Sequence, residues 1–123
     1  MGWTRRVIIF CSLALLALLV IASLIPAKWQ VLRTGLGWQS DHFIGFFVAT
    51  SVVCFAWPRP LLIAPILMTT AGLLEALQAL TPDRVPNLEA ALYGAGGTLV
   101  AALLATLIIH LWKRRANGPQ KTK

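Results

Sequence analysis

The residues best suited to chemistry lie in the stretch EALQALTPDR, Glu75 to Arg84, which closes a long apolar run. The chain has only four acidic residues, and two of them, Glu75 and Asp83, fall in this stretch. A carboxylate within an apolar segment avoids lipid, so we expect Glu75 to face a bundle interior or a wet cavity. The long side chain of Arg84 could reach back to pair with it. Such a pair could carry a function, or it could only lock two helices together.

Other polar residues lie at the ends of neighbouring apolar segments. Gln78 follows Glu75 by three residues, on the same side of a helix. Asp41 and His42 begin one apolar segment, and Asn87 and Glu89 begin another. If the segments are antiparallel helices, these ends meet, and one outward-facing polar site could be lined by eight residues: Asp41, His42, Glu75, Gln78, Asp83, Arg84, Asn87 and Glu89.

Several of these residues also have a purely structural interpretation. Asp41 could be a helix cap, as could its neighbour Ser40, and His42 could be an interfacial residue. Asp83 and Arg84 could form an ordinary exposed turn. His42 and the two nearby carboxylates could do acid–base work in a suitable geometry. No nucleophile motif accompanies them, so an enzyme is the less favoured class.

Composition identifies the kind of protein that holds these residues. The chain has 123 residues, of which 58% are hydrophobic and 12% charged, and its mean hydropathy is +0.75. Soluble domains carry about 25% charged residues, so this composition predicts an integral membrane protein with the lipid bilayer as its main partner. Cys11 and Cys54 lie in apolar runs without metal-ligand spacing. We therefore expect no metal and no cofactor.

Four apolar segments predict an all-α fold, a single small bundle of four transmembrane helices within residues 1–115. The first segment is longer than the 7–15 residues typical of a signal peptide and lacks a clear cleavage site, which favours a retained helix. The polar tail, residues 116–123, is predicted to be disordered, basic and cytoplasmic. The spans expected from the sequence are residues 7–25, 41–57, 61–80 and 88–112.

The basic residues predict the orientation of these spans. With four spans both termini share one side, and that side carries eight of the 11 Lys and Arg residues. The positive-inside rule then places both termini in the cytoplasm, in a multi-pass inner-membrane protein. This reading of the net charge of +7 is favoured over nucleic-acid binding. The polar site would face outward.

Small residues mark one side of the last segment. They recur at a spacing that lets helices approach closely in lipid. Packing within the bundle is favoured over dimerisation. The stripe consists of Ala90, Gly94, Gly97 and Ala101.

Three motifs together resemble the VanZ-like family of small bacterial membrane proteins. They are HFIGFF (His42–Phe47), GLLEALQALTPDR (Gly72–Arg84) and GAGG (Gly94–Gly97), within about half of the chain. In that family a His-Phe pair opens the second helix, and a Glu-x-x-Gln run with a nearby Pro and Arg closes the third. Trp38 and Gly94 depart from the family pattern, standing where an acidic residue and an Asn are usual.

The resemblance implies an envelope role. The family's namesake is associated with low-level resistance to teicoplanin, a glycopeptide that binds cell-wall precursors. The first hypothesis is therefore a protein that binds an envelope lipid, a precursor or a glycopeptide at the outer leaflet. The alternative is a small accessory subunit packed into a larger membrane protein complex. A proton-carrying role for Glu75 is a third idea.

Overall fold

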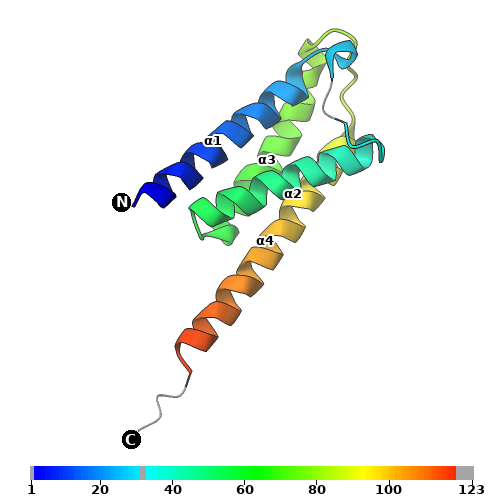
Figure 1. The fold of residues 1–123 in the computed structure, drawn as a ribbon. Coiled ribbons are helices and arrows are strands. Elements are labelled where there is room, and N and C mark those ends of the chain that lie inside the picture. The colour runs from blue at the N-terminus through cyan, green and yellow to red at the C-terminus, as the bar shows by residue number, and fades with distance from the viewer. Residues whose placement is uncertain (1, 31–32, 119–123) are drawn as a thin grey trace, which may run out of the picture.

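The computed structural model describes residues 2–30 and 33–118, and within them the chain is helical and has no strands. The all-α prediction is therefore confirmed. The elements in chain order are α1 (Trp3–Leu24), the 3₁₀ turn η1 (Ala27–Trp29), α2 (Trp38–Ala56), α3 (Pro60–Leu77), the 3₁₀ turn η2 (Gln78–Leu80) and α4 (Leu88–Ala116) (Figure 1).

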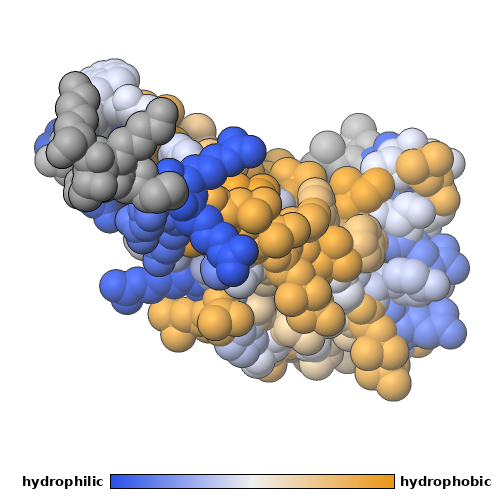
Figure 2. Space-filling view, turned by 90° about the horizontal axis from the view of Figure 1, so that it is seen from below, coloured by the Kyte–Doolittle hydropathy of each residue, from blue (hydrophilic) through white to orange (hydrophobic). Residues whose placement is uncertain are grey.

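The chain reverses direction at each connection between helices. The start of α1, the α2–α3 turn and the end of α4 lie toward one end of the molecule (Figure 1). The α1–α2 and α3–α4 connections lie at the other end, which we call the loop end. Seen from below, an apolar surface lies between polar residues at the two sides of the view (Figure 2). The candidate site residues from the helix ends are therefore brought to the loop end.

In the part of the chain that the structure describes, three helices are long and apolar enough to cross a membrane: α1, α3 together with η2, and α4. The α2 helix has 19 residues and carries Gln39, Ser40, Asp41 and His42 within its first turns, which lower its hydropathy. The α4 helix continues to Ala116, beyond the predicted end at residue 112. Most of the tail predicted to be disordered, residues 119–123, lies outside the described residues.

The α2 helix does not begin where the sequence suggested. The prediction that Ser40 or Asp41 caps it is wrong. The helix begins at Trp38, and its N-cap is Gly37, with φ 108°. That conformation is open to glycine and strained for other residues. Asp41 instead accepts hydrogen bonds from the backbone N–H and the hydroxyl of Thr34. The carboxylate therefore fastens the preceding loop to the first turn of α2.

The core of the fold is the contact between α2 and α4. The predicted stripe lies in it, since Ala90, Gly94, Gly97 and Ala101 are all buried. The closest approach is at Gly97, where an added Cβ would lie 2.2 Å from the carbonyl oxygen of Phe43. Small residues allow such backbone contact. In the same interface, the fully buried hydroxyls of Thr50 and Thr98 form a 3.1 Å hydrogen bond.

The α1 helix is the peripheral member of the bundle. Ser12 is its only buried residue, and its hydroxyl lies 2.8 Å from the carbonyl oxygen of Ile8 and 3.3 Å from that of Val52 in α2. Leu16, Leu19 and Leu24 pack partly against the core. The α1 helix thus contacts the rest of the bundle at a few positions along its length, and space remains between α1 and α2.

Candidate functional site

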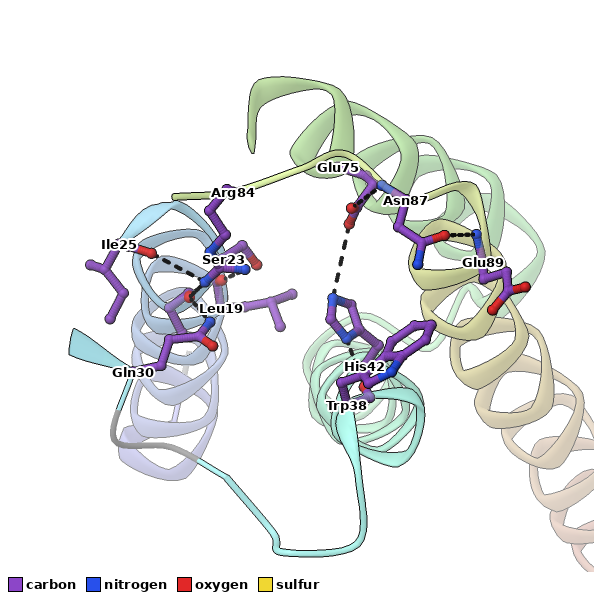
Figure 3. Close-up of polar contacts among 11 residues, drawn as sticks. Leu19, Ser23, Ile25, Gln30, Trp38, His42, Glu75, Arg84, Asn87 and Glu89 are labelled. Carbon is purple, nitrogen blue, oxygen red and sulfur yellow. Dashed lines mark hydrogen bonds and ion pairs between the residues drawn. The ribbon is translucent and has the colours of Figure 1, made fainter. Parts of the chain in front are cut away.

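Glu75 and His42 form the centre of the candidate site at the loop end. Glu75 is 6% exposed, in the last turn of α3, and its Oε2 lies 3.9 Å from Nε2 of His42 (Figure 3). This is the one ion pair within 4.0 Å among residues 2–30 and 33–118, and it requires a protonated His42. The predicted convergence of the second and third segments therefore takes the form of a His–Glu contact.

The second ring nitrogen of His42 restricts the chemistry of this contact. Nδ1 lies 2.8 Å from the carbonyl oxygen of Trp38, which can only accept a hydrogen bond. Nδ1 must therefore carry a proton. A neutral ring would then present an unprotonated Nε2 to Glu75, and a protonated ring would present an N–H. Nε2 and the Glu75 carboxylate face each other at 3.9 Å, beyond hydrogen-bond length, which leaves Nε2 available to a polar ligand group.

The other carboxylate oxygen of Glu75 holds the start of α4. Its Oε1 accepts a 2.6 Å hydrogen bond from the backbone N–H of Asn87. Asn87 is the N-cap of α4, and its side-chain oxygen accepts from the N–H of Glu89. A carboxylate at a helix N-terminus satisfies a free N–H and is stabilised by the helix dipole. Glu75 therefore also stabilises the start of α4, in addition to its contact with His42.

Arg84 does not form the ion pair with Glu75 suggested by the sequence. Figure 3 shows its side chain pointing toward the end of α1, where Nη2 lies 3.1 Å from the carbonyl oxygen of Ile25 and 3.4 Å from that of Ala22. Gln30 and Thr81 also donate to α1 carbonyls, those of Ala22 and Leu24. The last carbonyls of a helix lack partners within it. They draw Arg84 away from Glu75.

Arg84 is a partly buried cation in which one nitrogen lacks a hydrogen-bond partner. Burial lowers the pKa of Arg84 from its ordinary value, and the negative charge of Glu75 opposes that change. A guanidinium remains charged in proteins despite such a change. Its Nε is buried and has no hydrogen-bond partner in the described part of the chain. A buried donor without a partner is costly, but this atom is closed to solvent, so a ligand acceptor reaches it only if the side chain shifts.

A groove of about 230 Å³ between α1 and α2 connects Arg84 with His42. Its walls are mainly apolar and include Leu15, Leu18, Ile44 and Val48. Polar residues also line it: Ser23, Gln30, Asp41, His42, Gln78 and Arg84.

Gln78 contributes a second polar group to this groove. The residue is 4% exposed, and its amide side chain carries both donors and an acceptor. The groove therefore combines apolar walls with polar groups at one end.

The eight residues predicted to form one site are separated by the structure. Four of them line the groove: Asp41, His42, Gln78 and Arg84. Glu75 contacts His42 but does not line the groove. Glu89 is exposed in the first turn of α4, and Asp83 is exposed in the α3–α4 connection, with φ 63°. Neither lines the groove.

Sequence reasoning missed Ser23, Gln30 and Trp38. Gln30 and Ser23 line the groove, and Trp38 orients His42 through its carbonyl. The available signal for Gln30 was an uncharged polar side chain in the short connection after the first apolar segment. The described residues contain no group of three or more His, Cys, Asp or Glu side chains that could hold a metal ion.

Comparison of the chain with protein-family models, with curated proteins and with solved structures finds no match.

Proposed function

We propose that the protein binds an amphipathic envelope molecule in the groove between α1 and α2. The observation that carries this proposal is the groove itself, in which apolar walls lead to a polar end. Ligand sites are commonly apolar with a few placed polar groups. An acyl chain fits the walls, and a polar headgroup fits beside His42, Gln78 and Arg84.

The proposed setting is a bacterial inner membrane crossed by all four helices. The α2 helix packs along α4 and reverses direction between α1 and α3, which supports a fourth span. Arg5, Arg6 and Arg59 lie toward the end opposite the loop end, as does the run Lys113–Arg115. By the positive-inside rule that end, with both termini, is cytoplasmic. The loop end and the groove's polar residues then face outward.

The chemistry of the polar end favours a headgroup with hydrogen-bond acceptors. Arg84 offers a charged guanidinium, and Gln78 offers an amide. His42 adds a ring nitrogen, Nε2, which lies 3.9 Å from the Glu75 carboxylate. Envelope lipids and lipid-linked cell-wall precursors have such headgroups and acyl chains. The resemblance to VanZ-like proteins agrees with this class, because the motif residues His42, Gln78 and Arg84 line the groove.

We assign the site a binding role. Glu75 accepts a hydrogen bond from the start of α4 and lies beside His42. Both contacts stabilise the site, and neither requires a catalytic reaction. A membrane role without catalysis also agrees with the absence of a nucleophile motif in the sequence.

The test is to fill the groove and measure the lipid that copurifies with the protein. Gly45 lies in the groove wall, where an added Cβ would lie 3.5 Å from Leu19 Cδ1, so Gly45→Leu extends into the space. Gly72→Leu is the matched control, because a Cβ there meets nothing within 4 Å. After purification in mild detergent, mass spectrometry should find an envelope lipid or precursor with the parent and Gly72→Leu proteins. Gly45→Leu should lose it.

Equal lipid recovery with the two leucine variants would refute binding in the groove. Size-exclusion chromatography and circular dichroism check that each variant is folded. Sensitivity to teicoplanin in cells that carry the same variants tests whether the groove acts in a glycopeptide-related process.

The alternative function, an accessory subunit, is favoured by the lower half of α4. With 29 residues, α4 is about 43 Å long at 1.5 Å per residue, against about 30 Å of hydrocarbon. Its C-terminal half extends beyond the other helices (Figure 1) and exposes Leu103, Leu107 and Leu111. Stoichiometric recovery of a large complex from native membranes would support this alternative, and recovery of the protein with lipid alone would contradict it.

A further inference from the structure

A second hollow lies at the end of the molecule opposite the groove. It has a volume of about 420 Å³ and lies between the α2–α3 turn and the C-terminal half of α4. Arg59 contributes from the turn, and His110 and Lys113 contribute from α4. The hollow is therefore lined by cationic and titratable residues from two different parts of the chain.

These positive charges have no acidic counterpart nearby. The four acidic residues of the chain are Asp41, Glu75, Asp83 and Glu89, which belong to the loop end. Within the described residues, neither Arg59 nor Lys113 forms an ion pair, and both are exposed. The charge of this hollow is thus available to a negatively charged ligand.

Most of the remaining lining is apolar, and part of it is exposed. Leu61 and Leu62 are 80% and 57% exposed in the first turn of α3, and Ile109 lines the α4 side. Trp112, 77% exposed, follows one turn after Ile109. Tryptophan favours the depth of lipid headgroups. The hollow therefore combines a basic rim at headgroup depth with an apolar wall beside the acyl chains.

From this combination we infer that the hollow binds an anionic phospholipid of the leaflet at the end that carries both termini. The phosphate lies between Arg59 and Lys113, and the acyl chains lie along Leu61, Leu62 and Ile109. Basic pockets between transmembrane helices recognise anionic headgroups in this way. This site is independent of the groove between α1 and α2, with which it shares no lining residue.

The test compares two pairs of charge-removing substitutions. Arg59→Gln with Lys113→Gln removes two charges from the hollow. Arg114→Gln with Arg115→Gln removes two charges from the same last turn of α4, from residues that do not line it. Each protein is placed in phosphatidylcholine nanodiscs with a titrated fraction of phosphatidylglycerol. Native mass spectrometry then measures the phosphatidylglycerol that stays bound.

The Arg59/Lys113 variant should bind phosphatidylglycerol about 30-fold more weakly than the parent, because each basic residue contributes close to a factor of five. The Arg114/Arg115 variant should bind much more tightly than the Arg59/Lys113 variant, since its two lost charges do not line the hollow and contribute only general attraction to the anionic surface. Equal losses in both variants would show only general attraction to anionic lipid and would overturn the inference. Equal retention of phosphatidylcholine and phosphatidylglycerol by the parent would overturn it too. Inorganic phosphate at millimolar concentration should not displace the lipid.

Discussion

Replacing Gly97 with alanine tests the contact on which the bundle depends. The new Cβ would lie 2.2 Å from the carbonyl oxygen of Phe43, 3.0 Å from its carbonyl carbon and 3.1 Å from the backbone nitrogen of Phe47. A carbon and an oxygen in close contact stay about 3.3–3.6 Å apart. All three neighbours are backbone atoms, which cannot rotate away. The α2 and α4 helices must therefore separate by about 1 Å.

Separation on this scale has a cost that can be estimated. A gap of 0.5–1 Å forfeits roughly a quarter to a half of each dispersion contact, and overpacking of a well-packed core costs about 1–3 kcal/mol. Gly96→Ala is the matched control. Its Cβ would lie 3.9 Å from the Phe43 ring, an ordinary contact. We expect that control to be neutral or slightly stabilising, because alanine favours a helix over glycine.

The assay uses the buried thiol of Cys54, which is 5% exposed. In a Cys11→Ser background it is the remaining cysteine, and a maleimide reaches it when the bundle opens. Its labelling rate in detergent then follows the population of open molecules. Gly97→Ala should label about 5–150-fold faster than Gly96→Ala. Equal rates in the two variants would refute the backbone contact between α2 and α4.

Three further predictions follow from other contacts. Glu75→Ala should destabilise the protein by about 1–3 kcal/mol in denaturation by SDS, because the N–H of Asn87 loses its acceptor. Glu75→Gln, which keeps an acceptor, should cost less, and equal costs would contradict the capping role. Thr98→Val should cost about 0.6 kcal/mol, and no more when Thr50→Val is added, since one hydrogen bond joins the pair. In sealed cells of a cysteine-free background, Asn87→Cys should react with an impermeant maleimide and Asn117→Cys should not; reaction of both would refute the four-span orientation.

The helices themselves could be predicted because their signal is local. Uncharged apolar runs require internal hydrogen bonding in lipid, and a helix supplies it within one segment. The start of α2 was harder, since Gly37 permits a conformation that places Trp38 in the helix before the apolar run begins.

The polar site could be predicted only in part because its pairings are tertiary. The sequence indicated that Glu75 lies near other polar groups, and the helix ends do meet. It could not indicate that the free carbonyls at the end of α1 would attract Arg84. His42 becomes the neighbour of Glu75 through the way α2 lies against α3, a geometry that residue spacing within one segment does not contain.

The position of α1 has a consequence for how the groove is filled. The groove walls include Leu18, Ile44 and Val48, which are 46%, 37% and 42% exposed on the surface that lipid would cover. A ligand would therefore enter sideways from the bilayer and would already be confined to two dimensions and oriented. Occupancy would then depend on the ligand's mole fraction in the leaflet and not on its aqueous concentration. A minor lipid would fill the groove only if the preference of the site for it exceeds the ratio of bulk lipid to that lipid in the leaflet.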